Sequence, residues 1–285
     1  MRFARGGFVT VLAVVAAVVG VLMIPWLLRT VTNAMLFYPT RGQAATPDRF
    51  GIQYEERWLT SEDGVRIQAW WMPAEESSGS TVLSFHGNAG TLSDRLPWYR
   101  PVLQSGHSVL AVEYRGYGDS GGEPSEEGLA LDARSGLVLA RQLARERGDK
   151  LILHGRSLGG AVAIRLASDV ANEEPALDGV LIESTFTSLS AMAGRSGIPF
   201  GSKLVAYKFK SLERITESRV PLMLVHGEAD ELIPLSMGRA LVEAARGSGR
   251  EVRFLSVPSG THNDTWIVGG DLYWSNSLKF IENPS

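Results

Sequence analysis

The chain has 285 residues, of which 44% are hydrophobic and 21% are charged, and this composition is typical of a globular protein with a sizeable core. The formal net charge is −3 and no basic stripe is interleaved with aromatic residues, which argues against a nucleic-acid partner. The absence of cysteine excludes disulfides, thiol nucleophiles and cysteine metal sites.

The first feature along the chain is an uncharged apolar stretch from Phe8 to Leu28. About 20 such residues cross the core of a bilayer. The stretch ends in bulky residues and lacks the small-residue site of a cleaved signal peptide, so residues 1–30 are predicted to be a single-pass membrane anchor. The flanking arginines are nearly balanced, and we expect a cytoplasmic N-terminus with the following domain on the non-cytoplasmic side. A buried core helix is the alternative.

The remainder of the chain is predicted to be a linker, residues 31–50, followed by one α/β domain, residues 51–285. Two extended runs around a turn predict a β-hairpin, and further apolar runs, most of them followed by helical periodicity, predict a mostly parallel sheet with helices on both faces. The predicted strands are 54–60, 65–72, 81–85, 108–114, 150–153, 179–182, 221–225 and 251–257. The clearest helical pattern covers Glu126 to Arg147.

The segment of residues 187–219 interrupts this alternation and is predicted to be a short lid. It contains several glycines and a weak helical pattern from Lys203 to Ile215. Its bases outnumber its acids, although the whole chain is acidic. A solvated helix face explains this charge most simply, and contact with anionic lipid headgroups is the alternative.

The sequence Gly155-Arg-Ser-Leu-Gly159 joins a predicted strand to a predicted helix. A serine hydroxyl is a weak nucleophile that must be exposed, held still and given a base. A sharp strand-to-helix turn places Ser157 at its apex, and glycines on either side let the two elements approach closely. The first amides of the helix then point to where an oxyanion would form. A glycine-rich turn with an incidental serine is the alternative, because the five-residue pattern alone is weak evidence.

An acid and a base follow two later predicted strands in the order that a catalytic triad of this type requires. Asp230 follows the run 221–225, and His262 follows the last strand. Ser157 is expected to be the nucleophile, His262 the general base, and Asp230 the group that orients the imidazole. Glu183 is the alternative carboxylate.

Several other polar residues are expected to have structural roles. The remaining histidines are His86, His107, His154 and His226. Two arginines, Arg115 and Arg156, lie near the expected mouth of the pocket and could contact an anionic group, although salt bridges are the simpler expectation.

Five segments together resemble the serine hydrolases of the α/β-hydrolase fold, in particular a branch anchored in membranes by the N-terminus. These are residues 85–90, 114–122, 155–159, 226–230 and 261–263. The branch includes bacterial proteins of unassigned substrate and eukaryotic proteins that act on lipids or acylated proteins. The resemblance covers the chain from about residue 50 and implies two oxyanion donors, the amide of Leu158 and that of Asn88 or Ala89.

The sequence departs from that branch in the lid, where it has Thr185-Phe-Thr-Ser188 and Phe209-Lys-Ser211 in place of Pro-Phe-Thr-Ser and Phe-Asp-Ser. The expected function is hydrolysis of acyl esters or thioesters through an acyl-enzyme, without metal or cofactor, on lipid-like small molecules or acylated proteins. A tethered aminopeptidase-like or small-ester hydrolase is one alternative. A non-catalytic binding or scaffold protein with the same fold is another.

Overall fold

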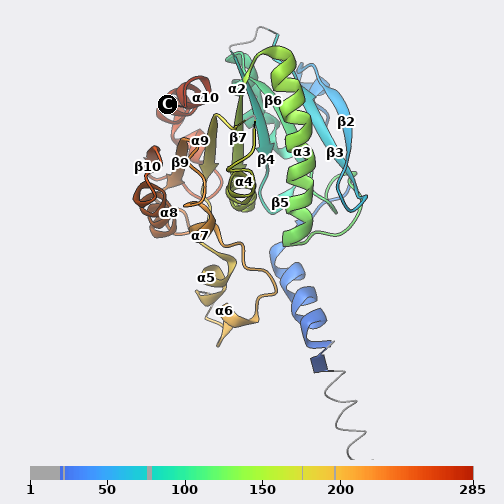
Figure 1. Cartoon of the computed structure of the whole chain (residues 1–285), viewed down its shortest axis with the longest axis vertical. Coiled ribbons are helices and arrows are strands. Elements are labelled where there is room, and N and C mark those ends of the chain that lie inside the picture. The colour runs from blue at the N-terminus through green and yellow to red at the C-terminus, as the bar shows by residue number, and fades with distance from the viewer. Residues whose placement is uncertain (1–19, 22, 76–78, 175, 196, 285) are drawn as a thin grey trace, which may run out of the picture.

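The computed structural model describes residues 20–21, 23–75, 79–174, 176–195 and 197–284. Much of the predicted membrane anchor lies outside these residues. Within the described ranges no helix is both long and apolar enough to cross a membrane. Residues 23–36 form a helix, which extends from the domain in Figure 1. The anchor therefore stays a prediction.

An eight-stranded sheet with the order β10-β9-β8-β7-β4-β6-β3-β2 forms the centre of the domain. Its strands are β2 (Glu55–Thr60), β3 (Arg66–Met72), β4 (Ser80–Phe85), β6 (Ser108–Val112), β7 (Lys150–Arg156), β8 (Gly179–Glu183), β9 (Leu222–Gly227) and β10 (Val252–Val257). Strand β3 pairs antiparallel with β2 and β6, and the other pairings are parallel. The predicted hairpin and mostly parallel sheet are confirmed.

Helices cover both faces of this sheet. They are α2 (Leu96–Gln104), α3 (Glu126–Arg147), α4 (Leu158–Asp169), α8 (Leu235–Gly247), α9 (Thr265–Val268) and α10 (Gly270–Glu282), with the 3-10 turn η2 (Leu92–Arg95). Neighbouring residues of β4 belong to different cores: Leu83 belongs to the cluster that includes residues of α3, α4 and α8, whereas Val82 belongs to the cluster that includes residues of α2 and α10. Burial on both sides explains why the parallel strands are continuously apolar.

Helix α3 has the bounds that its sequence pattern predicts, because a capping residue defines each of its ends. The Ser125 hydroxyl accepts a hydrogen bond from the Gly128 amide at the N-terminus, at 3.0 Å. Gly148 ends the helix with a left-handed backbone, φ 69°, which glycine adopts without steric cost.

The lid segment, residues 187–219, contains three short helices between β8 and β9. They are α5 (Leu189–Gly194), α6 (Gly201–Leu204) and α7 (Ser211–Arg214). The weak helical pattern from Lys203 to Ile215 is therefore interrupted. The amides of Lys208 and Phe209 donate to the carboxylate of Glu126 at the start of α3, both at 2.8 Å, so they do not join a continuous helix.

The predicted linker, residues 31–50, contains regular structure. The helix continues to residue 36, strand β1 (Tyr38–Pro39) follows, and the 3-10 turn η1 (Pro47–Phe50) comes last. Strand β1 pairs in parallel with β5 (Ala89–Gly90), and the intervening Phe37 is buried. In Figure 1 the helix lies at the same end of the molecule as α5 and α6.

Close backbone contacts between β4, β7 and α4 hold the centre of the sheet together. A Cβ at Gly159 would lie 2.1 Å from the carbonyl oxygen of Phe85, and one at Gly155 would lie 2.2 Å from the carbonyl oxygen of Gly159. Both neighbours are backbone atoms and cannot rotate away, so these positions require glycine.

We predict that Gly159→Ala lowers the free energy of unfolding by at least about 2 kcal/mol, since the added methyl group overpacks a rigid contact. Urea unfolding followed by circular dichroism measures this change. Gly247→Ala, at the end of α8, is the matched control because no described atom lies within 4 Å of its Cβ position, and it should cause no loss. Equal stability of the two variants would contradict the close approach.

Candidate active site

Ser157 lies at the junction of β7 and α4 with a backbone that non-glycine residues rarely adopt, φ 53° and ψ −116°. Such a conformation costs about 1–3 kcal/mol and persists only where the surroundings impose it. Here the Ser157 amide donates to the Glu183 carbonyl at 2.8 Å, and the Thr185 hydroxyl donates to the Ser157 carbonyl at 2.8 Å. The side chain is half-buried and faces a cavity.

The structure brings together the three side chains that the sequence proposed as a triad. His262 Nε2 lies 3.0 Å from Ser157 Oγ, and His262 Nδ1 lies 2.9 Å from Asp230 Oδ2. Because the carboxylate accepts from Nδ1, the tautomer with a hydrogen on Nδ1 leaves Nε2 able to accept the serine proton. The residues follow β7, β9 and β10, so the parallel sheet places distant parts of the chain at one edge.

Asp230 is held as a carboxylate by a dense set of donors. Its Oδ1 accepts from the amides of Leu232 and Ile233, at 3.0 and 2.7 Å. Burial by itself raises the pKa of Asp230, but the hydrogen bonds from His262 and from the Ile233 amide hold the pKa below its ordinary value. The ionised carboxylate can therefore stabilise an imidazolium at His262.

The loop that carries His262 is fastened on two sides. The guanidinium of Arg156, next to Ser157, donates to the His262 carbonyl, and the His262 amide donates to Glu231 at 3.2 Å. Arg115, the other arginine considered, forms a buried ion pair with Asp132 at 2.8 Å and a partly exposed ion pair with Asp63 at 2.6 Å. Arg115 thus forms salt bridges, as the sequence predicted. Arg156 instead donates a hydrogen bond to the loop that carries His262.

The loop after β4 approaches Ser157 closely enough to supply a second oxyanion donor. A Cβ at Gly87 would lie 3.6 Å from the Ser157 Cβ. Leu158 and Asn88 both line the cavity beside Ser157. Ala89 is exposed, belongs to β5 and is not among the described lining residues. Of these two residues, Asn88 is therefore the one that lines the cavity, and its role as an oxyanion donor stays a prediction.

Glu183, the alternative acid, belongs to a buried network behind Ser157. It contacts His154 Nε2 at 3.1 Å, and the Tyr273 hydroxyl donates to it. Burial alone raises the pKa of Glu183, but the hydrogen bond and charge of His154 lower the pKa below its ordinary value of 4.5. The Trp98 ring stacks on His154 with 3.8 Å between centroids. Asp230, and not Glu183, is the partner of His262.

The other histidines lie in local polar contacts. His86 Nε2 is 2.6 Å from a Glu113 oxygen, and its Nδ1 is 2.7 Å from the Gly87 carbonyl oxygen. His226 Nε2 donates to the Ile233 carbonyl at 2.8 Å, and burial lowers the pKa of His226. His107 is buried directly before β6. These contacts agree with the structural roles expected for them.

A cavity of about 530 Å³ opens above Ser157. Ser157, His262 and Asn88 line this cavity, and most of the other lining side chains are apolar. Most of the apolar lining comes from three segments: the N-terminal helix with Val31, Met35 and Leu36; the lid segment with Leu189, Met192, Ile198 and Leu204; and the loop after β9 with Leu232 and Ile233. A pocket of this size and polarity suits a largely apolar ligand that presents a polar group to Ser157.

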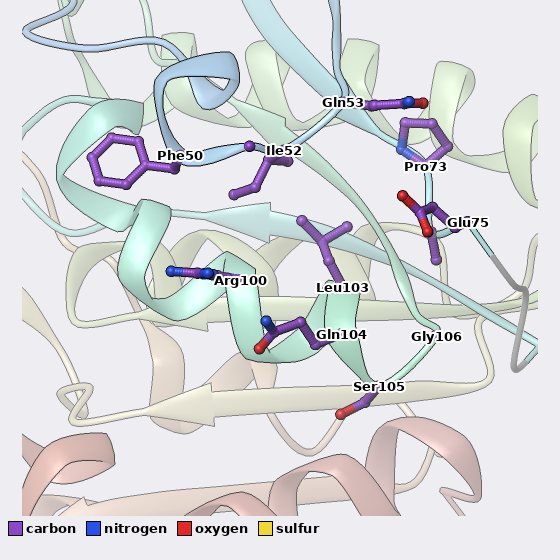
Figure 2. Close-up of a pocket in the computed structure, with 12 residues that line it drawn as sticks. Phe50, Ile52, Gln53, Pro73, Glu75, Arg100, Leu103, Gln104, Ser105 and Gly106 are labelled. Atoms are coloured by element: carbon purple, nitrogen blue, oxygen red, sulfur yellow. The ribbon is translucent and has the colours of Figure 1, made fainter.

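A second cavity, of about 650 Å³, lies between residues 50–53 and helix α2 (Figure 2). Arg100, Leu103 and Gln104 come from α2, and Glu75 lies beside Pro73. The cavity is lined by none of the residues that surround Ser157, and its lining contains no histidine among the described residues.

Sequence reasoning missed that the segment after residue 30 contributes to the cavity. It treated residues 31–50 as a linker, whereas Val31, Thr32, Met35 and Leu36 are lining residues. The available signal was the apolar run Met35-Leu-Phe-Tyr38, which a solvated linker would not need.

The sequence of this chain is similar to those of known hydrolase-fold proteins. The pattern of the Alpha/beta hydrolase family matches residues 82–209. The alpha/beta hydrolase domain-containing protein WAV2 of Arabidopsis thaliana is 34% identical over 85% of this chain and 83% of its own length. The uncharacterized membrane protein YNL320W of Saccharomyces cerevisiae is 35% identical over 86% of this chain and 87% of its own length. The chain belongs to the alpha/beta hydrolase family.

A solved structure confirms the fold. The Pyrococcus furiosus esterase Pf2001 superposes with a TM-score of 0.72 and 21% sequence identity, covering 87% of this chain and 97% of the esterase. At this identity the likeness concerns the fold alone. The predicted α/β-hydrolase architecture is thus confirmed independently of the site.

Proposed function

We propose that this chain is a serine hydrolase that cleaves acyl esters or thioesters through an acyl-enzyme at Ser157. The observation that carries the proposal is the continuous hydrogen-bonded chain from Ser157 Oγ through the His262 imidazole to the Asp230 carboxylate. Family membership supports hydrolase activity in general. Because the three groups have the geometry of a nucleophile, a base and an orienting acid, acyl transfer is the chemistry they suit best.

In the first half-reaction, Ser157 Oγ attacks the acyl carbonyl carbon while His262 Nε2 takes the hydroxyl proton. The resulting oxyanion accepts from the amides of Leu158 and Asn88, and each such donor contributes about 2.7–4 kcal/mol to transition-state stabilisation. The tetrahedral intermediate breaks its bond to the alcohol or thiol, which leaves with the proton from His262. Asp230 stabilises the imidazolium while that proton is held.

In the second half-reaction, His262 removes a proton from water as the water oxygen attacks the acyl-enzyme carbonyl. The bond to Ser157 then breaks, the acid is released and His262 returns the proton to Ser157 Oγ. The apolar cavity beside Ser157 favours lipid-like or acylated substrates over small polar esters.

We predict that Ser157→Ala abolishes hydrolysis of p-nitrophenyl octanoate by the detergent-solubilised full chain. Asp230→Asn should lower kcat about 10⁴-fold, because an amide cannot hold the same imidazole tautomer or balance the imidazolium. Steady-state kinetics measures both effects.

Asp264→Asn is the matched control for the aspartate variant. Asp264 lies in the same loop as His262, but its carboxylate accepts from the Thr261 amide at 2.6 Å and an amide oxygen can replace it. Its kcat should stay close to the native value. A folded Asp230→Asn variant with native kcat would contradict the proposed mechanism.

We further propose that the N-terminus is a single-pass anchor and that the hydrolase domain lies on the non-cytoplasmic side of the membrane. The uncharged stretch from Phe8 to Leu28 supports an anchor, and so do the exposed side chains of Met23, Ile24 and Leu27. The yeast relative is itself named a membrane protein.

We predict that the full chain stays in the membrane fraction after a wash with alkaline carbonate and is released by detergent, because an apolar span is held by lipid and not by charge. Protease added to right-side-out membranes should digest the domain. Release by carbonate would contradict the anchor, and protection until the membrane is opened would contradict the orientation.

A further inference from the structure

The N-terminal helix supplies one wall of the cavity above Ser157, and α5 and α6 of the lid segment supply another. Val31 and Met35 belong to the first wall, and Met192 and Leu204 belong to the second. The helix and these lid helices lie at the same end of the molecule (Figure 1). Ser157 lines the same cavity, so a ligand whose carbonyl reaches Ser157 can place its apolar part against these walls.

The helix wall is fixed to the base of the lid segment. The Thr32 hydroxyl oxygen accepts from the Ala206 amide at 3.0 Å, and Thr32 is buried. Arg29 Nε donates to the Tyr207 hydroxyl at 3.1 Å. The Phe37 and Tyr207 rings lie 6.0 Å apart between centroids. These contacts to Ala206 and Tyr207 fix the position of the helix beside the cavity.

The end of the same helix is fixed to the loop that holds the proposed oxyanion donor. The Asn88 side-chain amide donates to the Leu36 carbonyl at 3.0 Å, and the Tyr38 amide donates to the Asn88 carbonyl at 3.0 Å. The Tyr117 hydroxyl also donates to the Asn88 carbonyl, at 2.7 Å. The wall and the oxyanion loop are therefore one connected unit, which sets the distance between the bound apolar chain and the reacting carbonyl.

We propose that Val31, Met35 and Leu36 of the N-terminal helix form an acyl-chain site together with α5 and α6, and that its occupant is the linear acyl chain of the substrate. The proposal rests on the proposed function and adds to it a binding site for the acyl chain and a specificity-determining residue. Met35 is that residue: it lines the cavity, and as its side chain is 58% exposed it lies at the open edge. Each further buried methylene should raise affinity by about fourfold until the site is full.

The test compares the full-length protein with variants on a series of p-nitrophenyl esters from butyrate to dodecanoate. Met35→Trp places an indole across the chain path, so the ratio of kcat/KM for dodecanoate to that for butyrate should fall at least tenfold. Leu204→Trp obstructs the same path from the lid segment and should lower the ratio in the same direction.

Ala34→Trp is the matched control, because Ala34 is the exposed neighbour of Met35 and does not line the cavity among the described residues. It adds the same indole to the same helix and should leave the ratio at its native value. A native ratio in both Met35→Trp and Leu204→Trp, or an equal fall in Ala34→Trp, overturns the acyl-chain site.

That failure is distinct from failure of the proposed function. If the chain site is wrong but the catalytic proposal is right, butyrate hydrolysis still disappears in Ser157→Ala. If hydrolysis survives in Ser157→Ala, the catalytic proposal is itself wrong, whatever the ratios are.

Discussion

The backbone of Ser157 is the constraint on which the rest of the site depends. Its positive φ of 53° is unfavourable for serine, and it persists because the Glu183 carbonyl and the Thr185 hydroxyl fix both sides of the peptide. Gly155 and Gly159 let β7 and α4 meet without side chains between them. The strained turn raises the hydroxyl above the ends of the strands, where a base on another loop can reach it.

The sheet then determines which residues can meet that hydroxyl. Parallel order puts the ends of β7, β9 and β10 at one edge, so Asp230 and His262 reach the site from loops far away in sequence. Arg156 connects the serine turn to the histidine loop through the His262 carbonyl. The nucleophile and its base are therefore positioned by the same short turn.

The N-terminal segment changes how an anchor can relate to catalysis. Instead of ending in a solvated linker, the helix runs to residue 36 and continues into β1, which pairs with the loop after β4. Leu36 and Tyr38 both bond to Asn88. An element proposed to hold the protein at a membrane thus also shapes the cavity and supports the proposed oxyanion loop.

The sequence predicted the hairpin from two extended runs around a turn, the parallel strands from continuous apolar runs, and the full length of α3 from its helical periodicity. It also proposed the three residues that the structure brings together, because Ser157, Asp230 and His262 each follow a strand in recognisable local sequence. Their catalytic roles stay a prediction until tested.

Other features could not be predicted because tertiary contacts decide them. The helical pattern from Lys203 to Ile215 is interrupted where backbone amides donate hydrogen bonds to the carboxylate of Glu126, which is distant in sequence. Pro39, Gly42 and Pro47 indicated a linker over residues 31–50, but Phe37 is buried and β1 pairs with β5 in that segment. The choice between Asn88 and Ala89 also needed the cavity, since both lie in the same loop.

The measurement that tests the central claim most directly is covalent labelling of the solubilised full chain with a fluorophosphonate, followed by peptide mapping. The account predicts one adduct, on Ser157, which is absent in Ser157→Ala and strongly slowed in His262→Ala because the hydroxyl has lost its base. A folded protein that carries the adduct on another residue, or that labels at the native rate without His262, would contradict it.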